Sequence, residues 1–157
     1  MKVLVLNSGS SSIKFQLFDS AGWRPLASGS VTRIGEADGE IRAKWLDGEG
    51  RQQTREDHLP IASHQDGIDR IIAGLRQSGV LADLSELAAI GHRVVHGGER
   101  FHAPTVVDDA VAGAIRDMIP LAPLHNPANL DGIEVVRRLF PQVPSVAVFD
   151  TAFHQTM

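Results

Sequence analysis

KVLVLNSGSSSIKFQLFD, residues 2–19, is the stretch that decides how the chain folds. Its apolar run, residues 3–6, is short enough to be a strand buried on both faces. In residues 13–17 apolar and polar side chains alternate, which predicts a second strand with one face on a core. A polar turn joins the two, so we expect a tight hairpin.

The turn itself reads Asn7-Ser8-Gly9-Ser10-Ser11-Ser12. Backbone N–H groups, four hydroxyls and one amide side chain are exposed on such a turn, and this set of donors suits an oxyanion, above all a phosphate. The turn is not a Walker A loop, because no Gly-Lys-Ser/Thr follows Gly9 and a predicted strand, not a helix, comes next. Taken alone, an ordinary serine-rich connection explains the turn equally well.

Composition excludes several classes of protein. The 157 residues make one ordinary domain or a piece of a larger chain, and an apolar content of 43% is normal for a globular core. A net charge of −4 without a basic run argues against nucleic acid as a partner. With no cysteine, no bilayer-length apolar segment and no signal-peptide pattern, the sequence predicts a cytoplasmic protein without a membrane partner.

The order of predicted elements gives the fold class. Residues 1–59 predict an antiparallel meander of four or five strands, followed by helices and strands in alternation. The later elements are a helix from the Ser63 cap to Gly79, a strand over residues 88–95, a helix from the Asp108 cap to Pro120, a helix from Asn126-Pro127, and a strand over residues 146–149. We therefore predict an α/β domain with a mixed central sheet.

The strand IGHRVVHGG, residues 90–98, carries a candidate site residue. His92 and His96 are separated by roughly 13 Å along a strand, too far to share a metal ion. Alternation places Arg93 and Val95 on the face opposite to these histidines. An arginine between valines is costly to bury without an anion. Taken alone, a salt bridge to a neighbouring Asp or Glu explains Arg93 slightly better than a bound ligand does.

Two further candidates lie where the predicted elements begin or end. His125 precedes the Asn126-Pro127 helix start, where free N–H groups favour an anion and disfavour imidazolium. Asp150 follows the last predicted strand, at the sheet edge where α/β folds bind ligands, and could hold Mg²⁺. Each has a plain structural alternative: His125 could cap its loop, and Asp150 could cap the segment that follows it.

Four motifs together resemble the N-terminal part of the acetate kinases, within the acetate/propionate/butyrate kinase family. They are LNSGSSSIK (6–14), IGHRVVHGGE (90–99), PLAPLHNPANL (120–130) and VAVFDTAFHQTM (146–157). The resemblance implies a ribonuclease-H-like domain of the actin/hexokinase/Hsp70 type. It also implies Mg²⁺-dependent phosphoryl transfer between ATP and acetate, giving ADP and acetyl phosphate, in an enzyme that is a homodimer when complete.

The resemblance also implies a role for individual residues. Arg93, His125 and Asp150 would be catalytic. Asn7, Ser10, Ser12, Lys14, Arg93, Val95 and Leu124 would bind substrate, with Val95 and Leu124 lining the pocket for the methyl group. Asn7 and Asp150 would hold the metal.

The family's members continue far beyond the position matched by Met157, so the resemblance implies that a nucleotide-binding domain is missing from these 157 residues. We expect the chain alone not to turn over ATP. Propionate kinase is the alternative within the class, and Val95 favours the smaller acid by only about 1–3 kcal/mol per methylene. A non-catalytic module that binds phosphate or acyl phosphate, and a purely structural domain, are the alternatives from other classes.

Overall fold

The computed structural model describes residues 1–94, 105–117 and 126–149, which form one sheet and the helices packed on it. In chain order the elements are β1 (Lys2–Ser8), β2 (Ile13–Asp19), β3 (Arg24–Thr32), β4 (Gly39–Leu46), β5 (Gln52–Leu59), α1 (His64–Gln77), the 3₁₀ turn η1 (Leu84–Glu86), β6 (Leu87–Val94), β7 (Thr105–Val106), α2 (Asp109–Asp117), α3 (Asn126–Leu139) and β8 (Ser145–Phe149).

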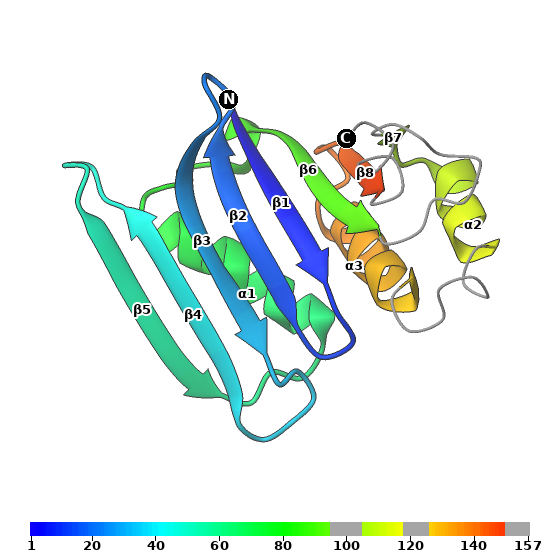
Figure 1. Ribbon diagram of the computed structural model, residues 1–157, viewed down its shortest axis with the longest axis horizontal. Helices are drawn as coiled ribbons and strands as arrows, with labels where there is room; N and C mark the ends of the chain where they lie inside the picture. The colour runs from blue at the N-terminus through cyan, green and yellow to red at the C-terminus, as the bar shows by residue number, and fades with distance from the viewer. Residues whose placement is uncertain (95–104, 118–125, 150–157) are drawn as a thin grey trace.

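The sheet is mixed, as the sequence predicts. Its strand order is β5-β4-β3-β2-β1-β6-β8-β7, with β1 to β5 antiparallel (Figure 1). From β1 onward the pairing becomes parallel, because β6 pairs with β1 and β8 with β6, and the short β7 closes the edge antiparallel to β8. The polar residues 52–59 form the edge strand β5, so the meander has five strands; an edge strand pairs on one side only and tolerates polar residues on both faces.

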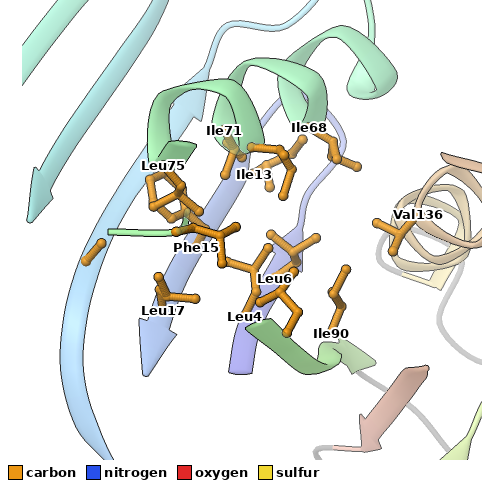
Figure 2. Packing of buried hydrophobic residues seen from close by; sticks show 14 of the residues in the cluster. Leu4, Leu6, Ile13, Phe15, Leu17, Ile68, Ile71, Leu75, Ile90 and Val136 are labelled. Carbon is orange, nitrogen blue, oxygen red and sulfur yellow. The ribbon is translucent and has the colours of Figure 1, made fainter. Parts of the chain in front are cut away.

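Alternation along the strands divides the sheet into two unlike faces. Leu4 and Leu6 of β1 and Ile13, Phe15 and Leu17 of β2 point to the face that carries α1 and α3, and all five are buried. The apolar stripe of α1 packs on them (Figure 2), and its members are Ile68, Ile71, Ile72 and Leu75. Burying each such side chain contributes about 1.5–3 kcal/mol, so this contact fixes which face of the hairpin is covered.

The predicted helix starts are confirmed. Ser63 Oγ accepts a hydrogen bond from the Asp66 N–H at 3.1 Å, and the Asp66 carboxylate accepts one from the Ala62 N–H at 3.1 Å. Asp108 Oδ1 accepts from the Val111 N–H at 2.8 Å at the start of α2. Gly79, two residues beyond the end of α1, has φ +81°, a conformation that glycine adopts without strain.

A second, smaller core lies where α2 and α3 pack beside β6 and β8. It joins Ile115 of α2, Leu130 and Ile133 of α3, Val94 of β6 and Ala147 of β8, all of them buried. The apolar face of α3 that holds Leu130 and Ile133 therefore contacts the parallel half of the sheet. Among the described residues, no helix has the length and apolar character needed to cross a membrane.

Candidate anion-binding site

Three sequence-distant segments end at the same edge of the sheet. The parallel strands β1, β6 and β8 have their carboxyl ends there, and the β1–β2 turn follows the end of β1 (Figure 1). Helix α3 immediately precedes β8 and packs on β1, β6 and β8, so it begins near this edge. In open α/β sheets this is the edge at which ligands bind, and a helix N-terminus adds N–H groups and a partial positive charge.

The β1–β2 turn is compact. Its last strand pair is Ser8 with Ile13, and the Gly9 N–H donates to the Ser12 carbonyl at 2.7 Å across the loop. A Cβ atom at Gly9 would lie 2.8 Å from Ser12 Oγ, closer than real Cβ contacts come, so glycine permits this approach. Ser10 is exposed and Ser12 half-buried, and both hydroxyls are carried on this short loop.

Asn7, Lys14 and Arg93 meet on the face of the sheet opposite to α1 and α3. Asn7 and Lys14 are direct cross-strand partners. The β1–β6 register pairs Val5 with Gly91, so Arg93, two residues later, lies level with Asn7 on the same face. Three adjacent strands span only about 10 Å, a width suited to one small anionic ligand.

These three side chains line one hollow of about 480 Å³. The remaining lining residues are Val5, Phe15, Gln16, Ser28, Gly29 and Ser30. The lining thus holds two cationic side chains, several uncharged polar groups and no carboxylate, so its charge favours an anion. Arg93 itself is exposed. From the sequence we assumed that this arginine is buried at a cost in free energy, and the structure does not bear out that assumption.

His92 lies on the other face, as strand alternation predicts. Its side chain is buried, and its Nε2 lies 3.3 Å from Ser145 Oγ of β8. Burial penalises the imidazolium form and lowers the pKa of His92 from 6.5 to about 3. His92 is therefore neutral at pH 7 and acts as a buried polar link between β6 and β8, not as an acid in the hollow.

Four predicted site residues lie outside the described residues. They are Val95, Leu124, His125 and Asp150. The described elements that flank them end or begin at the same sheet edge, since β6 ends at Val94, α3 begins at Asn126 and β8 ends at Phe149. The structure therefore brings together Asn7, Lys14 and Arg93, with the Ser10 and Ser12 turn following directly after Asn7.

Sequence reasoning missed two residues that contact the turn. His64 of α1, to which the sequence analysis assigns no role, has its Nε2 2.6 Å from the Gly9 carbonyl. Asn129 of α3 donates from Nδ2 to the Ser8 carbonyl at 2.8 Å. Ser8 itself faces the helices, and its buried Oγ has no hydrogen-bond partner among the described residues. No local pattern reveals these contacts, because the partners are 55 and 121 residues apart.

Two other features of the described residues are separate from the hollow lined by Asn7, Lys14 and Arg93. Glu40, Glu56 and His58 form a group whose ligand atoms lie within 4.8 Å of one another, but the two carboxylates already pair with Arg42 on the exposed β4–β5 hairpin. A second hollow, of about 470 Å³, lies between α1 and the β4–β5 hairpin and has a largely apolar floor that includes Trp45. Neither contains a predicted site residue.

Comparison with known proteins gives the family. The family model described as the Acetokinase family matches residues 2–157. An acetate kinase from Maridesulfovibrio salexigens is 54% identical over 159 residues, covering 100% of this chain and 39% of that protein. An acetate kinase from Streptomyces coelicolor is 52% identical over 156 residues, covering 99% of this chain and 38% of that protein.

Solved structures agree. A propionate kinase from Francisella tularensis superposes with a TM-score of 0.87 at 37% identity, over 99% of this chain and 38% of that one. An acetate kinase from Porphyromonas gingivalis gives 0.86 at 38% identity, over 99% and 39% of the two chains. These matches confirm the ribonuclease-H-like fold that the motifs imply. The chain spans about 39% of the length of the curated relatives it matches, and by sequence and fold it belongs to the acetokinase family.

Proposed function

We propose that residues 1–157 form the N-terminal domain of an acetate kinase, which binds the acyl substrate and phosphate. The complete enzyme would transfer a phosphoryl group reversibly from ATP to acetate, giving ADP and acetyl phosphate. The observation that carries the proposal is the convergence of Asn7, Lys14 and Arg93 on one anion-favouring hollow at the carboxyl edge of the sheet. Relatives named acetate kinase, 46–54% identical across the chain, support it.

The chemistry of phosphoryl transfer explains these residue types. Phosphoryl transfer requires alignment of the reacting groups and stabilisation of their charge, and it does not require a protein nucleophile. Acetate is already an anion, so it needs relief from repulsion by the triphosphate and no strong general base. The Arg93 guanidinium, with its planar fork of donors, would hold the carboxylate and then the equatorial phosphoryl oxygens, while the Lys14 ammonium would add a compact positive charge.

Mg²⁺ fits the donors that the turn offers. The Asn7 amide oxygen and the Ser10 and Ser12 hydroxyls are oxygen ligands, the type that Mg²⁺ prefers, and Asp150 would complete the set directly or through water. When bound, the ion would neutralise charge on the phosphate groups. Asn7 and the serines would then orient the phosphate from the turn, through side-chain and backbone N–H donors.

The remaining residues enter the proposal through the family motifs. His125, directly before α3, would donate a hydrogen bond to the transferring phosphoryl group. Val95 and Leu124 would line the methyl pocket. A nucleotide-binding domain in the complete enzyme would cover this edge of the sheet and form a cleft with it. We propose that the complete enzyme is a cytoplasmic homodimer.

Propionate kinase is the second candidate, and the solved propionate kinase at 37% identity is the observation that favours it. One methylene changes specificity by only about 1–3 kcal/mol, so enzymes for the two acids can share this fold. Comparing kcat/KM for acetate and propionate on the complete enzyme would separate them, and a preference for propionate would refute the acetate assignment.

The site is tested on the 157-residue chain by following amide resonances during titration with acetyl phosphate. We expect shifts at Asn7 and Lys14, and loss of these shifts in Arg93→Ala. The matched control is Arg51→Ala, an exposed arginine on the β4–β5 turn that pairs with Glu49, and it should leave binding unchanged. Binding that survives Arg93→Ala would refute the assignment of this hollow.

A non-catalytic module would bind but stay inactive in the complete protein, and turnover of ATP by residues 1–157 alone would refute the proposed division into two domains.

A further inference from the structure

The backbone of the β1–β2 turn is held from the helix side by two side chains. The Ser8 carbonyl accepts a hydrogen bond from Asn129 Nδ2 at 2.8 Å, and the Gly9 carbonyl lies 2.6 Å from His64 Nε2. Since a carbonyl only accepts, His64 Nε2 carries the proton in this contact. Two successive peptide groups of the turn are thus fixed, one by α3 and the other by α1.

A third contact comes from the loop after β3. The Ile34 N–H donates to the Ser11 carbonyl at 3.0 Å. The turn therefore rests against three different parts of the chain on its covered side. Ser8 and Asn129 are only 4% and 3% exposed, so solvent water has little access to replace the Asn129 donor.

The geometry of the peptide bond shows which way the N–H groups of the anchored turn point. In a planar trans peptide the C=O and the following N–H point in opposite directions. Because the Gly9 carbonyl points to His64 on α1, the Ser10 N–H of the same peptide points away from that helix. Because the Ser8 carbonyl points to Asn129, the Gly9 N–H points into the turn, where it donates to Ser12.

We propose that His64 and Asn129 are positioning residues for oxyanion binding: they fix the Ser8–Gly9 and Gly9–Ser10 peptides so that the turn presents the Ser10 N–H to a phosphoryl group. The proposal rests on the proposed function and extends it to two residues outside the hollow. A turn ordered before the ligand arrives loses little backbone entropy on binding, and this raises the affinity for the anion.

The test removes each donor and measures the turn and the ligand separately. In His64→Ala and Asn129→Ala, amide hydrogen exchange at Gly9 and Ile34 should be about two- to tenfold faster, the range given by the net contribution of one hydrogen bond. Exchange at Leu17, in the centre of β2, should be unchanged. The dissociation constant for acetyl phosphate should rise by a similar factor.

Two variants serve as controls. His64→Gln retains a side-chain N–H donor and should restore part of the protection and of the affinity. His58→Ala removes an exposed histidine of β5 that pairs with Glu40 and Glu56, and it should change neither. If Asn129→Ala fails to fold, the comparison of His64→Ala with His64→Gln tests the positioning role instead. His64 is only half-buried, so its substitution should leave the protein folded.

The outcomes distinguish a failure of the positioning role of His64 and Asn129 from a failure of the proposed function. Unchanged exchange at Gly9 and Ile34 would overturn the anchoring itself. Faster exchange with unchanged affinity would show that the contacts are structural only, and would overturn the positioning role. If the wild-type chain binds no acetyl phosphate while exchange still responds to the substitutions, the proposed function fails and the positioning role fails with it, but the anchoring of the turn stands.

Discussion

Gly132→Ala should destabilise the protein, although alanine favours helices. Gly132 lies in α3 against the end of β1, where a Cβ atom would overlap Ser8 Oγ and lie 3.0 Å from Ser8 Cβ. Ser8 is 4% exposed and belongs to a central strand, so it has little room to move away. The contact joins α3 to the strand that carries the candidate anion-binding turn.

Two opposing magnitudes set the expected result. Adding a methyl group to a tightly packed contact typically costs about 1–3 kcal/mol. Replacing glycine with alanine inside a helix contributes about 1 kcal/mol in the other direction. The net expectation is a loss of about 1 kcal/mol in the free energy of unfolding. Gly74→Ala in α1 is the matched control, since a Cβ there has no neighbour within 4 Å and should stabilise by about 1 kcal/mol.

Urea unfolding of the two variants measures the difference, and Ser8→Ala completes the test. The Ser8 hydroxyl is buried and has no partner in the part of the chain that the structure describes, so Ser8→Ala alone should stabilise by about 1 kcal/mol by removing an unsatisfied polar group. Ser8→Ala should also reduce the cost of Gly132→Ala, because it removes the nearest clashing atom. Equal stabilisation by Gly132→Ala and Gly74→Ala would refute the close packing of α3 on β1.

Three further predictions concern stability. Burial lowers the pKa of His92 from its ordinary value of 6.5 to about 3, so between these pH values the unfolded chain binds more protons than the folded one. The free energy of unfolding should therefore fall as pH drops from 6.5 towards 3, by up to about 1.4 kcal/mol per pH unit, and His92→Gln should flatten this part of its pH profile. Ser63→Ala removes the N-cap of α1 and should cost about 1 kcal/mol in urea unfolding, whereas Ser63→Asp should retain the cap. Leu6→Ala should cost about 2–5 kcal/mol, because Leu6 is 1% exposed; a cost under 1 kcal/mol would contradict the packing beneath the hairpin.

Local signals in the sequence were enough to predict most of the fold. The hairpin was predictable because apolar alternation and a turn of small polar residues coincide over residues 2–19. The starts of α1 and α3 were predictable because Ser63 and Asn126-Pro127 act within one helical turn. Strand β5 was less clear, since an edge strand exposed on both faces has no apolar period to detect.

The site was only partly predictable, because it depends on contacts between residues that are far apart in the sequence. Residue type and alternation identify Asn7, Lys14 and Arg93 as candidates, but their meeting depends on a parallel pairing of β1 with β6, whose paired residues are more than 80 positions apart in the sequence. The anchoring by His64 and Asn129 is less visible still. Nothing in the residues beside either one indicates which distant carbonyl it binds.

The contact of Gly132 with Ser8 also bears on the register of β1. Consecutive strand residues point to opposite faces, so a shift of β1 by one residue towards its carboxyl end would turn Ser8 to the face of the hollow and place Asn7 against α3. The space above Gly132 is already filled by a serine, and the longer asparagine side chain would not fit there. Close packing by a glycine on the covered face therefore disfavours this register error, which would remove Asn7 from the anion-binding face. The fold specifies the candidate site through a residue that does not itself line the hollow.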